Sequence, residues 1–221
     1  MPLLSLDVIR STWNAMGSWT SAEADRGAKR FVDRQPIVNA AVLALTEDAG
    51  EDVASIALYC ACAIAECYEA ARGRALPRVR ERIMDEALEG MERWGRDLER
   101  MEEQLFARRA LYGRDHYQPY LVAELIRYLI DATDEGEFDG EDLGIIFSVL
   151  LAVIRAFDRV SGVPRRVPSM GQVLKELTGR PLPCLYRLSP CPCGSGRRCR
   201  ECCLRKRGPA SARNLLPARL Q

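Results

Sequence analysis

Apolar residues recur at helical intervals through the first 162 residues of the chain. We expect Pro77 to open a long helix, because Ile83, Leu88 and Met91 then follow at spacings of five and three residues, the stripe of an amphipathic helix. The alternation of apolar and polar residues that marks a strand is not sustained anywhere. The sequence therefore predicts an all-α fold, with an acidic helical bundle over residues 1–162.

Capping residues and prolines indicate where single helices begin. Thr20 with Glu23 is a capping signal for a helix that runs to about Asp33, and Pro36 lies in a first-turn position of the next helix. The segment 51–72 is almost wholly apolar or alanine. A helix that is apolar on all sides is a buried one, so we expect this segment to be the central helix of the bundle.

Two further helical patterns, 118–133 and 141–160, form the last pair of the predicted bundle. The acidic turn DATDEGEFDGED joins them and places Gly136 at the sixth position of a twelve-residue calcium loop. The calcium ligands would then be Asp131, Thr133, Glu135, Asp139 and Asp142. Against this hypothesis, the twelfth position lacks the usual bidentate glutamate, and acidic residues also suit a solvated turn ahead of a helix. Cation binding at this turn is left open.

Prolines interrupt the helical pattern beyond the bundle. Residues 163–190 read as a Pro-rich linker that contains one short helix, opened by Ser169 as N-cap and closed by Gly179. A cysteine-rich segment, 191–207, follows the linker, and residues 208–221 read as a flexible basic tail.

Charge is divided unevenly along the chain, although its formal net charge is only +1. Residues 163–221 hold 13 Lys or Arg and two acids, a net charge of +11, whereas residues 1–162 hold 19 basic and 29 acidic residues, a net charge of −10. The basic end favours an anionic partner, for which a nucleic acid, an acidic protein surface and the acidic body of the same chain are all open alternatives. Aromatic residues for base stacking are scarce there, with only Tyr186 upstream of the cysteines.

The sequence predicts a cytoplasmic protein with no membrane span. No run of about 18 apolar residues occurs, and the N-terminal segment lacks a basic region ahead of an apolar stretch. In a reducing compartment, nine cysteines indicate metal ligands or buried thiols rather than a disulfide framework.

The segment CPCGSGRRCRECC, residues 191–203, holds five of the nine cysteines. A C-x-C pair and a C-C pair, separated by eight residues, supply the four converging soft ligands that tetrahedral zinc needs. The predicted Zn²⁺ ligands are Cys191, Cys193, Cys202 and Cys203. Cys199 is the one thiol left over. A segment this short has no core of its own, so metal binding would supply its folding energy.

The order C-P-C-G-S-G, then basic residues, then C-C resembles the SEC-C motif. This motif is the small zinc module at the C-terminus of the SecA translocation ATPase and of many otherwise unrelated bacterial proteins. The match covers about 13 to 17 of the 221 residues, and Cys199 stands where the family has an aromatic residue. In SecA the module docks on the SecB chaperone and on the ribosome and is not catalytic. The chain has no G-x-x-x-x-G-K-[ST] phosphate loop, so the resemblance implies the metal and the docking role alone.

Basic residues and one leucine surround and follow the predicted zinc ligands. We expect the partner-binding surface to consist of Arg197, Arg198, Arg200, Leu204, Arg205, Lys206 and Arg207. The leading interpretation is a non-enzymatic adaptor that docks on a protein, a ribosome or another ribonucleoprotein. Three alternatives stay open: a zinc ion that only holds the C-terminal segment folded, a nucleic-acid-binding regulator that uses the basic end, and an enzyme with its active site between the helices.

The remaining chemically reactive side chains are predicted to be structural. Cys60, Cys62 and Cys67 lie in the apolar segment 51–72, and core thiols are common. His116, the only histidine, stands at a helix boundary with no serine or cysteine nucleophile nearby in sequence, so a general base is not favoured.

Trp13 and Trp19 lie in STWNAMGSWT, which we expect to be irregular. They are interpreted as packing residues, with the alternative that they cover a groove between helices.

Overall fold

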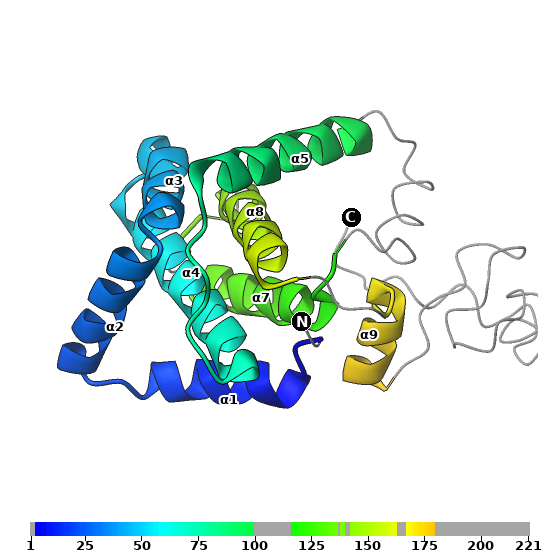
Figure 1. The fold of residues 1–221 in the computed structure, drawn as a ribbon. Coiled ribbons are helices and arrows are strands. Elements are labelled where there is room, and N and C mark those ends of the chain that lie inside the picture. The colour runs from blue at the N-terminus through cyan, green and yellow to red at the C-terminus, as the bar shows by residue number, and fades with distance from the viewer. Residues whose placement is uncertain (1–2, 100–115, 137, 140–141, 163–166, 180–221) are drawn as a thin grey trace, which may run out of the picture. The chain divides into compact units, whose positions relative to one another are not determined.

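The fold is that of a computed structural model, which describes residues 3–99, 116–136, 138–139, 142–162 and 167–179. These residues form α-helices and one short 3₁₀-helix, and no strand occurs among them (Figure 1). The elements are α1 Leu6–Gly17, α2 Ser21–Arg34, α3 Pro36–Thr46, η1 Glu47–Ala49, α4 Glu51–Arg72, α5 Glu81–Glu99, α7 Pro119–Asp134, α8 Leu143–Ser161 and α9 Met170–Thr178. The all-α prediction is confirmed for this part of the chain.

The chain divides into two compact units. The first contains α1 to α5, α7 and α8, and the second contains α9. Within the first unit, α4 packs against α1, α2, α3 and α8, and α8 packs against α3, α4, α5 and α7 (Figure 1). The prediction of a central buried helix over 51–72 is confirmed, and α8 shares the centre with it.

The apolar composition of α4 is explained by its position in the core. Ten of its side chains are buried, among them Ile64 and Tyr68. By length and composition alone α4 would also be able to cross a membrane. An 18-residue stretch of this helix has a mean hydropathy of 1.4, and 56% of that stretch is buried inside the fold. Core helices of soluble proteins have the same composition, so this finding is weak, and the expected lack of a membrane span stays a prediction.

The predicted helix starts at Thr20, Pro36 and Ser169 are confirmed. Thr20 and Glu23 form a reciprocal capping box at the start of α2, and Pro36 occupies the first turn of α3. The Ser169 hydroxyl accepts a hydrogen bond from the backbone N–H of Gln172, and Gly179 ends α9 in the left-handed conformation at φ = 63°.

Two predicted boundaries are wrong. The segment STWNAMGSWT is not irregular, because α1 continues to Gly17, with the Ser5 hydroxyl capping its N-terminus. Pro77 does not open α5, which begins four residues later at Glu81. A long-range contact holds the residues between Pro77 and Glu81 outside the helix.

That contact is made by Gln35, a buried side chain at the junction of α2 and α3. Its Oε1 accepts a hydrogen bond from the backbone N–H of Val79 at 3.0 Å, and its Nε2 donates to the carbonyl oxygens of Leu76 and Pro77 at 3.5 and 3.1 Å. Because Gln35 satisfies these backbone groups, residues 75–80 do not need a helix to pair them.

Candidate functional site

The predicted zinc ligands Cys191, Cys193, Cys202 and Cys203 lie outside the residues that the structure describes. The same is true of Cys199 and of the expected contact residues Arg197, Arg198, Arg200, Leu204, Arg205, Lys206 and Arg207. Among the described residues, no group of three or more His, Cys, Asp or Glu side chains is arranged to hold a metal ion. The zinc site therefore stays a prediction from the sequence.

The three cysteines of α4 are core residues, as predicted. Cys60, Cys62 and Cys67 are all buried. Burial raises the pKa of Cys62 and of Cys67 to about 12, and the nearby Glu66 carboxylate adds to both shifts. These two thiols therefore stay protonated at neutral pH, which suits packing and not metal ligation or nucleophilic attack.

The acidic turn starts with helical residues. α7 continues through Asp134, so Asp131 and Thr133 lie in its last turn. Asp131 Oδ2 accepts a hydrogen bond from Arg127 Nη1 at 2.8 Å, and the Thr133 hydroxyl donates to the carbonyl oxygen of Leu129 at 2.8 Å. Two of the five expected calcium ligands are thus engaged within the helix.

The aromatic residues that the sequence singled out have packing partners. His116 lies edge-on to Trp94, with 5.9 Å between ring centroids, and Trp13 contacts Tyr128 at 6.0 Å. Trp19 covers Gly27 so closely that a methyl group there would stand 2.4 Å from the indole ring. Gly27 thus allows α2 to approach this ring.

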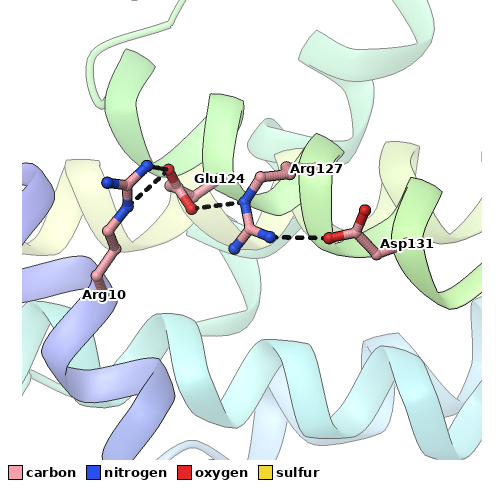
Figure 2. Close-up of polar contacts among 4 residues, drawn as sticks. All are labelled: Arg10, Glu124, Arg127 and Asp131. Carbon is pink, nitrogen blue, oxygen red and sulfur yellow. Dashed lines mark hydrogen bonds and ion pairs between the residues drawn. The ribbon is translucent and has the colours of Figure 1, made fainter. Parts of the chain in front are cut away.

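The described residues also contain an ion cluster that sequence analysis did not find (Figure 2). Its centre is Glu124 on α7, whose side chain is only 4% exposed. Arg10 on α1 donates to Glu124 Oε1 from Nε at 3.1 Å and from Nη2 at 2.7 Å. Arg127 on α7 donates from Nε to Glu124 Oε2 at 3.0 Å and from Nη1 to Asp131 Oδ2 at 2.8 Å. One buried carboxylate therefore joins α1 to α7 and orients two guanidinium groups.

The electrostatic balance at Glu124 favours the ionised carboxylate. Burial acts to raise its pKa, but the hydrogen bonds and charges of Arg10 and Arg127 together outweigh burial and lower the pKa. A buried glutamate with two guanidinium partners stays charged at neutral pH. The cluster is thus a fixed ionic group and not a proton donor.

A hollow of about 210 Å³ lies beside this cluster, between α1 and α7. Its lining includes Ile9, Arg10, Trp13, Glu124, Arg127 and Tyr128. The two arginines of the lining are balanced by Glu124 and by Asp131, which pairs with Arg127, so the ion cluster beside the hollow is neutral as a whole. The alternative interpretation of Trp13, that it covers a groove between helices, agrees with its position in this wall.

The sequence offers one local signal for the cluster. Glu124 is a lone charge within the apolar run LVAELI of the predicted helix 118–133. An acid in the apolar face of a helix needs a partner, which predicts a pairing but not its identity. Arg10 is 114 residues away in sequence, so only the packing of α1 on α7 reveals it.

A second buried polar group lies in the core, between α4 and α8. The Tyr68 hydroxyl donates to Asp158 Oδ1 at 2.8 Å, and both side chains are at most 1% exposed. Asp158 Oδ2 and the neighbouring Gln118 Nε2 have no hydrogen-bond partner among the described residues, whereas Gln118 Oε1 accepts from the backbone N–H of Leu4 at 2.8 Å. Burial raises the pKa of Asp158 to about 7, although Tyr68, Gln118 and Arg155 act to lower it.

Comparison of the chain with protein-family models, with curated proteins and with solved structures gave no match.

Proposed function

We propose that this protein is a non-enzymatic, zinc-binding adaptor of the cytoplasm. Its C-terminal SEC-C-like segment would bind one Zn²⁺ and dock on a protein or ribonucleoprotein partner. The observation that carries the proposal is the order C-x-C, eight residues, C-C within CPCGSGRRCRECC. The basic residues around these cysteines support an anionic partner surface.

The metal is tested by replacing one predicted ligand and, as a matched control, the leftover cysteine of the same segment. We expect the full chain to bind about one zinc per molecule and Cys202→Ser to lose it, because three thiolates no longer close a tetrahedral site. Cys199→Ser should keep the zinc. The readout is the metal content of purified protein. Equal zinc in the Cys202→Ser variant and the parent would contradict the assignment.

Docking is tested by co-sedimentation of the full chain with purified ribosomes. Reversing the charge of Arg205, Lys206 and Arg207 to Glu should reduce binding at least about tenfold, since these residues would meet the anionic surface. The control Arg213→Glu/Arg219→Glu alters the charge of the tail beyond the module and should retain binding. Equal losses in the two variants would show that diffuse tail charge, and not the module, makes the contact.

A nucleic-acid-binding regulator is the second candidate, and the net charge of +11 over residues 163–221 is the observation that favours it. Binding driven by phosphate contacts weakens steeply as salt rises, in proportion to the number of contacts. We therefore expect a double-stranded DNA or RNA probe to show a steep salt slope if this candidate is correct. A protein-docking surface predicts little binding to either probe at physiological salt.

A further inference from the structure

The guanidinium groups of Arg10 and Arg127 line the hollow between α1 and α7. Each of them donates some of its hydrogen bonds within the ion cluster. Arg10 uses Nε and Nη2 on Glu124, and Arg127 uses Nε on Glu124 and Nη1 on Asp131. In Figure 2 no dashed line joins Nη1 of Arg10 or Nη2 of Arg127 to the other residues drawn. The side chains of Arg10 and Arg127 are about half exposed, at 50% and 59%, and both line the hollow.

The two carboxylate oxygens of Glu124 beside the hollow are already occupied. Glu124 Oε1 accepts two hydrogen bonds from Arg10, and Oε2 accepts one from Arg127. The two guanidinium groups therefore retain donor capacity beside the hollow. A ligand that complements them supplies oxygen acceptors, and a carboxylate does so with charge-assisted hydrogen bonds.

Preorganisation distinguishes these arginines from ordinary surface arginines. A free arginine loses side-chain entropy when it binds an anion. Here the 4% exposed carboxylate of Glu124 already fixes both guanidinium groups, so the cost of ordering them is met in the unliganded protein. A guanidinium held in one orientation also binds a carboxylate with better defined geometry.

Apart from Asn14, the other lining residues of the hollow are aromatic or apolar. Trp13 and Tyr128 contribute aromatic rings, 6.0 Å apart between centroids, and Ile9 is a fully buried residue of the lining. The volume of about 210 Å³ exceeds the ~150 Å³ of an engineered cavity that holds benzene, so one aromatic ring with a small substituent fits.

From the donors of Arg10 and Arg127 and from the aromatic walls, we infer that this hollow binds a small aromatic monocarboxylate. The carboxylate lies against the two guanidinium groups, and the ring of the ligand lies against Trp13 and Tyr128. This site is separate from the proposed zinc segment and does not depend on it.

Benzoate is the probe, and the indole N–H signals of the full chain in NMR spectra are the readout. The chain has three tryptophans, and the signal missing in Trp13→Phe identifies Trp13. We expect the Trp13 signal to shift saturably with a Kd of about 1 mM, a typical value for so small a ligand. The neutral analogue benzamide should bind at least about tenfold more weakly, and acetate, which lacks the ring, should also bind more weakly.

Arg127→Met should weaken benzoate binding at least about tenfold, and Arg127→Lys should recover part of it. The matched control is Arg34→Met, which removes another half-exposed arginine, one that pairs with Glu69 at 2.9 Å. It should change the Kd less than about twofold, and circular dichroism confirms that each variant is helical.

Three results would overturn the inference. They are the absence of a saturable Trp13 shift up to about 20 mM benzoate, equal binding of benzoate and benzamide, and an equal loss in Arg127→Met and Arg34→Met.

Discussion

Single buried charges in this protein are of two kinds. Glu124 has two guanidinium partners that keep its pKa low, whereas Asp158 has the Tyr68 hydroxyl on one oxygen and, within the described part of the chain, no partner on the other. Burial dominates at Asp158 and raises its pKa to about 7. Both are buried acidic side chains, but Glu124 is an ionic link between two helices, whereas Asp158 is a group that titrates near neutral pH.

Asp158 should make the stability of the protein depend on pH. Its folded-state pKa of about 7 exceeds the ~3.9 of an unfolded aspartate, so its stabilising contribution is full below pH ~4 and is lost as pH rises to about 7. Asp158→Asn keeps an acceptor for Tyr68 and removes the titration. Relative to the parent, its free energy of unfolding should therefore rise between pH 4 and 7, by up to ~4 kcal/mol.

Urea unfolding at several pH values measures this difference. The exposed Asp25→Asn is the control, for which we expect no comparable trend. A constant difference between Asp158→Asn and the parent across this pH range would show that Asp158 does not titrate there.

At the scale of the elements, caps and prolines begin most helices, but one tertiary contact moves the start of α5. Gln35 pairs the backbone groups of Leu76, Pro77 and Val79 and keeps them outside the helix. Arg78 supports the same junction from the surface, where its guanidinium donates to the carbonyl oxygens of Asp33 and Arg34. The C-terminal carbonyls of α2 are thereby satisfied by a residue 44 or 45 positions away.

Replacing Gln35 should destabilise the protein. Gln35→Leu leaves the buried N–H of Val79 and two carbonyl groups without their partner, and each such group costs about 1–3 kcal/mol. We expect a loss of at least ~2 kcal/mol in the free energy of unfolding, measured by urea denaturation. Arg78→Met, which removes exposed hydrogen bonds at the same junction, should cost less than ~1 kcal/mol. A loss for Gln35→Leu no larger than that of Arg78→Met would rule out this role.

On the scale of the whole molecule, the helices of the two compact units follow the division of charge along the chain. The helices of the first unit all lie within residues 1–162, which have a net charge of −10, and α9 and the proposed zinc segment lie within residues 163–221, which have a net charge of +11. Such a division suits an adaptor in which one part binds an anionic surface while the other carries a separate site. The zinc, docking and benzoate experiments test these two parts independently.

The sequence by itself determined the helical class, the starts of α2, α3 and α9, the central position of α4 and the burial of its cysteines. These features depend on apolar periodicity and on side chains that cap backbone groups within about four residues of themselves. Both signals are therefore contained in a single segment of the sequence. The zinc ligands are also a prediction of this local kind, and they lie outside the described residues.

Only the tertiary structure decided the pairing of Arg10 with Glu124, the burial of Asp158 against Tyr68 and the late start of α5. The partners in these contacts are 114, 90 and 44 residues apart, so the packing of the helices brings them together. The apolar run around Glu124 shows that a partner is required, but its identity depends on which helix covers that face. The hollow arises from the same packing, because its donors and aromatic walls come from α1 and α7, which are far apart in the sequence.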